Sequence, residues 1–377
     1  MNRMIRPTLF ALAASLGLSA LPAPALAQGS EEKPSARFQG EANVREVLLD
    51  VLVTDRQGNV IVGLDKGDFV VTENGKPVDL TGVTFYSNRQ YLESKEGVAV
   101  KSLNVDKVPE NRYFILFFED QKSADADAPG LLAQQLEAGR RAKEWVSKEL
   151  LANDYVAVVS YDQKLKVQQD FTRDRSALLG AIGNAVQAKD PESNWPSRIA
   201  QKGDGPTLLA ALPRGNDLRD KTATIYDALR VLAKATGGVT GRKNVLLFTI
   251  GFGQINNFGQ YIPDARYYPP MMQALNDNNV AVYPIDIVPA GTQHPLSNAE
   301  NQLATDTGGQ YFFNFTNFLV PLAKVSRENN GYYLLSYQAT HPGDKSGFQK
   351  VVVKSTNPEF RLRAREGYAY GGKSTGR

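Results

Sequence analysis

The sequence predicts a doubly wound α/β domain with a mostly parallel sheet, flanked by β strands towards both ends of the chain. Two observations lead to this fold class. Between residues 112 and 330, short apolar runs alternate with helical periods, as in a parallel sheet covered by helices. On either side of this segment, apolar and polar residues alternate with a period of two, which is typical of half-buried strands. The 377 residues are enough for two or three domains.

The composition excludes several functional classes. The chain has no cysteine, which excludes a disulfide scaffold, thiol catalysis and Cys-ligated zinc. Its two histidines, His294 and His341, fall in Pro/Gly-containing turns and belong to no Ser-His-Asp order or His-x-x-x-His pair. Lys and Arg total 43 and Asp and Glu total 40, so the net charge of +3 predicts no nucleic-acid partner.

Residues 1–27 are predicted to be a secretory signal peptide. Arg3 and Arg6 precede an apolar run over 9–21, and small residues at Ala25 and Ala27 suit a signal peptidase. About 13 apolar residues are too few to cross ~30 Å of hydrocarbon, and no later stretch is long and apolar enough to form a membrane span. We therefore expect an exported bacterial protein, periplasmic or extracellular, whose mature chain carries about one net positive charge.

The β segments at the two ends are expected to form one sandwich. Residues 28–43 are polar and predict a flexible lead-in, and 44–100 form its first part. Within that part, Asn74-Gly75 is a strong hairpin signal. This segment is too short and edge-rich to be stable alone, so we expect it to pair with strands in 331–370, before a flexible tail over 371–377. Two separate β appendages are the alternative.

The central domain, 108–330, is expected to contain five strands and six helices. Residues 188–220 lack any period and predict an insertion loop. The strands are expected over 113–118, 155–161, 243–249, 280–286 and 309–313, and the helices over 129–151, 175–186, 224–235, 271–279, 298–306 and 319–328.

Several segments, taken in order along the chain, carry a resemblance to known proteins. They are VLLDVLVTD (47–55), GLDKGDF (63–69), FFED (117–120), TIYDAL (224–229), GRKNVLLF (241–248), LATDTGGQY (303–311), YYLLSY (332–337) and RAREGY (363–368). On these segments, the central domain resembles a von Willebrand factor type A domain, and the chain as a whole is similar to the bacterial VWFA-related family first noted in acidobacteria.

The resemblance implies a divalent-metal site at the carboxyl ends of the strands, and this chain departs from its pattern. The family pattern is Asp-x-Ser-x-Ser after the first strand, a Thr before the third helix and an Asp after the fourth strand. Here Glu119 replaces the Asp and Ser123 matches, while the Thr position falls on Ala223, with Thr222 and Thr224 beside it. The second Asp position falls on Ile250, which cannot coordinate a metal.

The first loop contains four carboxylates within nine positions, at Glu119, Asp120, Asp125 and Asp127. They could form a rearranged Mg²⁺ or Ca²⁺ site, or a solvated acidic loop before a helix N-terminus, where negative charge is favourable. The departures favour the second interpretation, a degenerate metal-dependent adhesion site with no bound metal, no cofactor and no catalytic residue. The ligand-facing loop residues are then Glu119, Asp120, Gln121, Ser123, Thr222 and Thr224.

The function predicted from these features is an exported, non-enzymatic protein-binding or adhesion-type module with a protein partner of unknown identity. Tyr261, Tyr267 and Tyr268 lie in the loop after the expected strand 243–249, where tyrosines suit protein binding or cover the end of the sheet. One alternative is a metal-dependent hydrolase that uses the acidic loop 119–127. Another is a structural component of an envelope assembly.

Export predicts a defined mature end. Cleavage after Ala27 should leave Gln28 as the first residue of the protein recovered from its source cells. Amino-terminal sequencing, or the mass of the intact protein, measures this directly. Recovery of a chain that still begins with Met1 would contradict both the signal peptide and the compartment.

Overall fold

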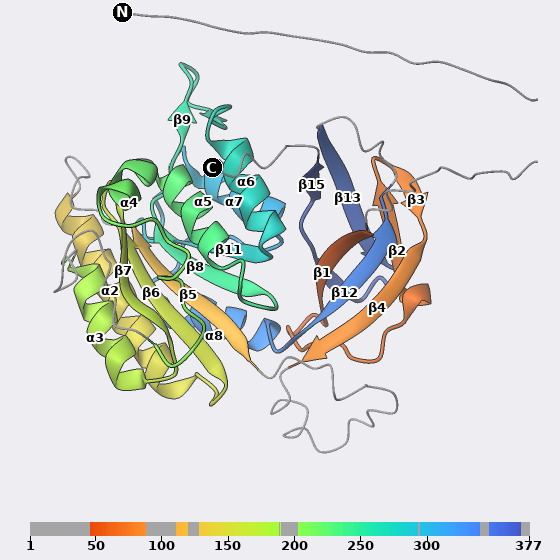
Figure 1. Ribbon diagram of the computed structural model, residues 1–377, viewed down its shortest axis with the longest axis horizontal. Coiled ribbons are helices and arrows are strands. Elements are labelled where there is room, and N and C mark those ends of the chain that lie inside the picture. Colours follow the sequence, from red (N-terminus) through yellow and green to blue (C-terminus); the bar gives the residue numbers. More distant parts are fainter. Residues whose placement is uncertain are drawn as a thin grey trace, which may run out of the picture. The chain divides into compact units, whose positions relative to one another are not determined.

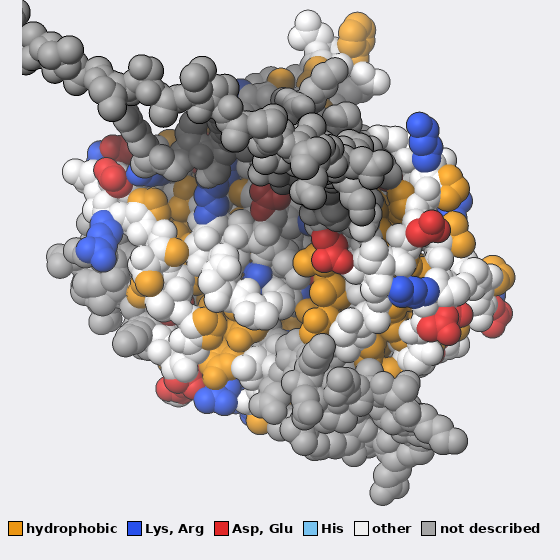
Figure 2. Space-filling model, turned by 45° about the vertical axis from the view of Figure 1, so that its right-hand side comes forward, with side chains coloured by type: hydrophobic (Ala, Val, Ile, Leu, Met, Phe, Trp, Pro, Cys, Tyr) orange, Lys and Arg blue, Asp and Glu red, His pale blue; other side chains and the backbone are white. Residues whose placement is uncertain are grey.

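The computed structural model describes residues 46–87, 111–119, 128–187, 189, 203–292, 295–339 and 347–370, all within one compact unit, Asn43–Arg377. The expected signal peptide, lead-in and tail lie outside the described residues, as do Asp120, Gln121, Ser123 and both histidines. Within the described part, every helix is too short or too polar to cross a membrane. On the face shown in Figure 2, acidic and basic side chains are interspersed.

A five-stranded sheet forms the centre of the α/β domain (Figure 1). Its strand order is β11-β8-β5-β6-β7, and only the edge strand β7 is antiparallel to its neighbour. This mixed, mostly parallel sheet confirms the predicted fold class. The strands are β5 (Arg112–Glu119), β6 (Asp154–Tyr161), β7 (Leu165–Thr172), β8 (Lys243–Thr249) and β11 (Val280–Asp286).

Helices cover both faces of this sheet, and each face has its own apolar core. On β5, Ile115 and Phe117 point into one core, whereas Phe114, Leu116 and Phe118 point into the other. Burial on both faces explains why the strand is apolar at successive positions. The helices α2 (Ala128–Lys148), α3 (Arg175–Val186) and α8 (Leu319–Glu328) cover one face, and the other carries α4 (Asn216–Lys221), α5 (Ile225–Ala235), α6 (Tyr268–Asp277) and α7 (Ser297–Thr307).

Strands from both flanks of the α/β domain together form the sandwich, as the predicted fold class required. One sheet has the order β14-β1-β12-β4 and the other β15-β13-β2-β3, and all of their pairs are antiparallel. The strands are β1 (Glu46–Thr54), β2 (Phe69–Glu73), β3 (Lys76–Val78), β4 (Leu80–Ser87), β12 (Gly331–Gln338), β13 (Gly347–Ser355), β14 (Arg361–Arg363) and β15 (Gly367–Tyr370), with the short 3₁₀ helix η1 (Lys66–Asp68) before β2.

Local sequence and a buried carboxylate explain how the sandwich closes. Asn74 and Gly75 have φ angles of 49° and 79°, so the β2–β3 hairpin turns at the dipeptide that predicts it. Inside the sandwich, Glu73 is 1% exposed and accepts hydrogen bonds from the hydroxyls of Tyr337 and Tyr368, each at 2.8 Å. Because Tyr337 belongs to the opposite sheet, this carboxylate connects the two layers through paired polar groups.

The structure differs from the sequence expectation at strand β7. No strand was expected between residues 161 and 175, yet Leu165–Thr172 forms the antiparallel edge of the central sheet. The alternation of apolar and polar residues holds only over 165–168 and is interrupted by Gln169 and Asp170, so the strand signal in the sequence is weak. Lys166, Gln168 and Asp170 are nevertheless all below 9% exposure in the fold.

The predicted insertion loop contains packed structure. Leu208, Leu212 and Leu218 join the apolar core, and α4 begins at Asn216. Asp170 of β7 anchors this segment by accepting hydrogen bonds from Thr207 Oγ1 at 2.6 Å and from the Leu208 backbone N–H at 2.9 Å. Individual side chains anchor this segment, and they leave no periodic pattern in the sequence from which its structure could be predicted.

A strand was expected over 309–313, but this segment forms only an isolated bridge. Phe312 forms an isolated parallel bridge with Ile285 of β11, with backbone hydrogen bonds that also join Phe312 to Asp286 and Pro284. Gly309 lies so close to β11 that an added Cβ would be 1.8 Å from the Val282 carbonyl oxygen. This close approach requires glycine.

Candidate functional site

The candidate site lies at the carboxyl edge of the parallel sheet, where open α/β sheets place their ligands. The strands β5, β8 and β11 end at Glu119, Thr249 and Asp286, so these three side chains approach the same edge. Only Glu119 among them was a sequence-predicted site residue.

Glu119 is held by the neighbouring strand. The Thr249 hydroxyl donates a hydrogen bond to Glu119 Oε2, and its oxygen accepts one from the Gly251 backbone N–H at 2.9 Å. Gly251 has a φ of 82°, and a Cβ there would be 2.6 Å from Leu296 Cβ, so the turn after β8 requires glycine. Burial raises the pKa of Glu119 to about 7, although the bond from Thr249 acts in the opposite direction. At neutral pH this carboxyl is therefore partly protonated.

Two further carboxyl groups lie at this edge that sequence reasoning missed. Asp286 is 5% exposed and accepts hydrogen bonds from the Val288 backbone N–H at 2.8 Å and from the Tyr311 hydroxyl at 3.1 Å. Glu300 of α7 is 1% exposed, and burial, with the nearby charge of Asp286 as a smaller cause, raises its pKa to about 10. Asp286 ends an apolar strand and could have been noticed, whereas Glu300 looks like any helical glutamate.

Ile250 occupies the position where the family pattern has a metal-ligating Asp. Its side chain is half-buried and packs against the apolar core on the α2, α3 and α8 side of the sheet. The position therefore supports the core and supplies no oxygen to the edge.

The two threonines at the predicted site act within the fold. Thr222 is fully buried, donates to the Leu218 carbonyl oxygen at 2.6 Å and accepts from the Leu165 backbone N–H at 3.1 Å. Thr224 is the N-cap of α5, where its oxygen accepts from the Asp227 backbone N–H at 3.1 Å. Asp120, Gln121 and Ser123 lie outside the described residues, so the structure does not place them beside Glu119.

These groups do not assemble a hard-cation site in the described part of the chain. No cluster of three or more His, Asp or Glu residues there is arranged to hold a metal ion. Mg²⁺ and Ca²⁺ need several anionic or carbonyl oxygens at one point.

A hairpin that the sequence analysis missed projects beside this edge (Figure 1). It consists of β9 (Gln254–Ile255) and β10 (Tyr261–Ile262), and Phe258 at its turn is 87% exposed. Asn256 Oδ1 holds the turn by accepting hydrogen bonds from the backbone N–H groups of Phe258 and Gln260, both at 2.9 Å. The exposed ring is therefore presented on an ordered turn.

The tyrosines singled out in the sequence lie at the base of this hairpin. Tyr267 stacks on Tyr226 with ring centroids 6.1 Å apart, and Phe252 meets the same ring edge-on at 5.0 Å. Tyr268 is buried in α6 and donates to Asp306 Oδ2 at 2.7 Å. Tyr261 begins β10. These rings form a base for the hairpin, and Tyr268 acts in the core rather than as a surface contact.

Comparisons with known proteins find structural neighbours only. No protein-family model matches the chain, and no curated protein matches it. Solved structures that it resembles include proximal thread matrix protein 1 from the mussel byssus, with 18% identity, a TM-score of 0.36 and coverage of 58% of this chain and 47% of that one. An aerotolerance-related membrane protein from Bacteroides fragilis matches with 12% identity, a TM-score of 0.35 and coverage of 58% and 98%.

A third neighbour is the set of three N-terminal domains of the type V pili tip protein Mfa5 from Porphyromonas gingivalis, with 12% identity, a TM-score of 0.37 and coverage of 80% of this chain and 67% of that one. The chain spans less than half the length of the mussel protein that it matches. At these identities and TM-scores, the fold assignment rests on the sheet topology described above.

The buried Glu300 predicts a pH-dependent stability. Its folded-state pKa of about 10 is above the ordinary 4.5, so the folded protein binds the proton more tightly than the unfolded chain. The resulting contribution is fully favourable below about pH 4 and is lost as pH rises towards 10. Glu300→Gln should therefore raise the free energy of unfolding at pH 8 relative to the parent protein, and much less so at pH 4.

Urea unfolding at the two pH values measures this difference. Glu359→Gln is the matched control, because that side chain is 70% exposed and its ion pair with Arg56 lies in solvent. An equal effect of Glu300→Gln at both pH values would contradict the protonated state of Glu300.

The geometry also predicts weak metal binding. Calorimetric titration of the protein with Mg²⁺ or Mn²⁺ should show no affinity tighter than roughly millimolar, the weak end of protein divalent sites. Ile250→Asp restores the acid of the family pattern at this position and should move the affinity towards tighter binding. A micromolar isotherm that Glu119→Ala abolishes would refute this prediction and favour the hydrolase alternative.

Proposed function

We propose that this chain is an exported, non-enzymatic protein-binding module of the adhesion type, which contacts its partner through the carboxyl edge of the sheet without a metal. The observation that supports this most directly is the β9–β10 hairpin, whose Phe258 ring is 87% exposed on an ordered turn.

The hairpin has the properties of a contact element. Ile255 and Ile262 are 45% and 46% exposed, and the strand register places them on opposite faces of the hairpin. Single exposed apolar residues are ordinary, but here they flank an exposed aromatic ring at the turn of a projecting hairpin. Because Asn256 and the aromatic base order the turn in advance, little conformational entropy would be lost when a partner buries Phe258. Aromatic anchors of this kind contribute most of the affinity in many interfaces.

The chemistry of the edge supports a metal-independent mode. In a metal-dependent mode a cation would bind the partner's carboxylate. Here Ile250 packs against the core and supplies no oxygen ligand, and Glu119 is bonded to Thr249. We therefore include in the proposal that the metal-dependent adhesion site of the family pattern is degenerate in this chain. A hydrolase would need the loop 120–127, which lies outside the described residues, to complete a cation site beside Glu119.

We also propose that the chain is exported and that it belongs to the bacterial VWFA-related family. The segment 1–27 has the charge, apolar run and small residues of a signal peptide, which supports a periplasmic or extracellular location. The ordered set of segments between 47 and 368 supports membership of the bacterial VWFA-related family. If the protein is instead a structural component of an envelope assembly, the same edge of the sheet would hold a permanently bound partner.

Phe258→Ser should weaken partner capture. Affinity purification of the tagged protein from the envelope and medium of its source cells should recover a partner equally with and without EDTA. Removal of the Phe258 ring should reduce that recovery about tenfold or more, because a buried aromatic anchor is worth about 2 kcal/mol or more.

Phe348→Ser is the matched control for this experiment. Phe348 is 60% exposed but lies on β13 of the sandwich, far along the chain from the hairpin. Equal recovery with both variants, or loss of the partner on addition of EDTA, would contradict the proposed contact.

A further inference from the structure

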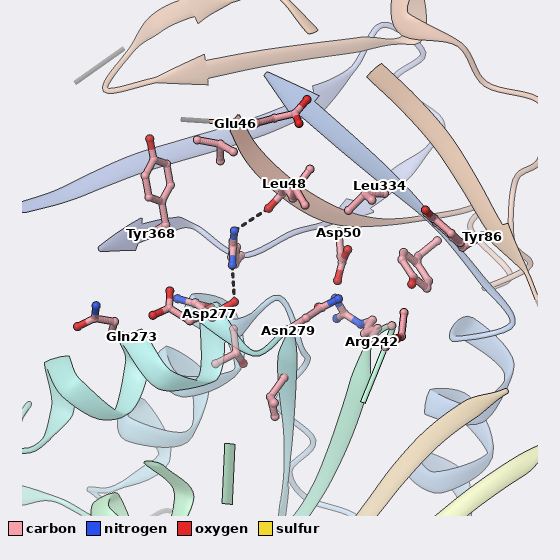
Figure 3. A pocket seen from close by; sticks show the side chains of 18 of the residues that line it. Glu46, Leu48, Asp50, Tyr86, Arg242, Gln273, Asp277, Asn279, Leu334 and Tyr368 are labelled. Carbon is pink, nitrogen blue, oxygen red and sulfur yellow. Dashed lines mark hydrogen bonds between the residues drawn. The ribbon is translucent and has the colours of Figure 1, made fainter. Parts of the chain in front are cut away.

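A cleft of about 630 Å³ lies between the sandwich and the α/β domain, distinct from the edge that carries the hairpin (Figure 3). One wall is the outer face of the β14-β1-β12-β4 sheet, and the other is built where β8 and β11 begin. The edge with Glu119 is formed where these parallel strands end, so the cleft belongs to the opposite end of the sheet. Its volume is in the range of small-molecule sites, which occur preferentially between domains.

The period of two along β1 places specific side chains in this cleft. Val47, Leu49 and Val51 point into the sandwich core, so Leu48 and Asp50 point outwards into the cleft. The neighbouring strands add aromatic rings to the same wall. Tyr86 of β4 stacks on Tyr332 of β12 with centroids 5.4 Å apart and an interplanar angle of 20°.

The opposite wall is polar. The end of α6 supplies Asn276 and Asp277, and the turn into β11 supplies Asn279. Arg242 precedes β8 and donates to the Gly308 carbonyl oxygen at 2.6 Å, which fixes its guanidinium in the floor of the cleft. Amide, carboxylate and guanidinium groups therefore face the aromatic and carboxylate groups of the sandwich.

Arg365 connects the two walls. Its guanidinium donates to the Leu48 carbonyl oxygen at 2.6 Å and to the Asn276 carbonyl oxygen at 2.7 Å. One acceptor belongs to the sandwich and the other to the α/β domain, so this side chain bridges the cleft and sets its width at one end.

Two charged groups in the cleft are buried and incompletely paired. Asp50 is 8% exposed and Arg242 is 6% exposed. Asp50 Oδ2, Arg242 Nε and Arg365 Nε have no hydrogen-bond partner among the described residues. Burial raises the pKa of Asp50, although the charges of Arg242 and Arg365 oppose that shift. Buried polar atoms without partners are uncommon in folded proteins, and here one acceptor and two donors share one cleft.

The mixture of charges restricts what can bind there. An anion would be repelled by Asp50 and Asp277, and a cation would be repelled by Arg242 and Arg365. An apolar ligand would leave Asp50 Oδ2, Arg242 Nε and Arg365 Nε without partners, at a cost of a few kcal/mol for each buried group. A hydroxyl group both donates and accepts, so adjacent hydroxyls can satisfy a carboxylate and a guanidinium together. Flat apolar faces of the ligand would lie on the Tyr86 and Tyr332 rings.

We propose that this cleft is a binding site for a neutral carbohydrate of about two sugar rings. Asp50 accepts from a ligand hydroxyl through its unpartnered Oδ2, Arg242 and the amide of Asn276 donate to ligand oxygens, and the stacked tyrosines form an aromatic platform. This function is independent of partner binding at the hairpin.

The test is calorimetric titration of the full chain with cellobiose, maltose and N,N′-diacetylchitobiose, with saturation-transfer NMR to detect weaker binding. At least one of these saccharides should bind. Asp50→Asn should weaken that binding about tenfold or more, because a hydrogen bond to a charged group contributes about 1.5–3 kcal/mol. The same change should leave the melting temperature equal or higher, since it removes a buried carboxylate.

Two further variants separate a binding role from a structural one. Asp217→Asn on α4, where the side chain is 70% exposed, should leave saccharide affinity unchanged. Tyr86→Leu removes one ring of the aromatic platform, keeps every charge and should also weaken binding. The proposal is overturned if none of the three saccharides binds, if Asp50→Asn lowers the melting temperature without changing affinity, or if the tripeptide trialanine binds more tightly than the saccharides.

Discussion

The pairing of β1 with β12 is the constraint on which the rest of this structure depends. Val51 of β1 lies opposite Tyr333 of β12, and the entire α/β domain lies between these two strands in the sequence. Closing so long a loop costs conformational entropy, which the buried residues of the sandwich core and the Glu73 carboxylate offset. The same pairing places the outer face of β1 opposite the α/β domain and so creates the cleft.

A buried ion pair holds the junction between the two parts of the fold. Arg112, at the start of β5, donates two hydrogen bonds of 2.6 Å to Asp154 of β6. Its remaining nitrogen donates to the Ser326 carbonyl oxygen at 2.6 Å and to Asn330 Oδ1 at 2.7 Å. These bonds join the beginning of the central sheet to the last turn of α8 and to the residue that precedes β12. The charges are compensated on every side, in contrast with Asp50 and Arg242 in the cleft.

The two ends of the central sheet differ in how their polar groups are used. At the carboxyl edge, Glu119 and Asp286 are bonded within the fold, and the exposed feature is the apolar turn at Phe258. At the amino end, Asp50 and Arg242 are buried beside a cleft with atoms that have no partner among the described residues. The first arrangement favours contact with a protein surface, and the second favours a small polar ligand.

The sequence by itself determined the features that depend on local periodicity and turn chemistry. These are the parallel strands, the Asn74-Gly75 hairpin, the β character of both flanks, and Ile250 in place of an acid. Tertiary structure alone decided the features that depend on contacts between distant residues. Strand β7 was missed because Gln169 and Asp170 interrupt its alternation, although the fold buries them. Glu300 becomes unusual because the fold buries it, with the charge of Asp286 as a smaller cause. Likewise, Asp50 continues an ordinary strand pattern, and only the apposition of the α/β domain buries its charge without a full set of partners.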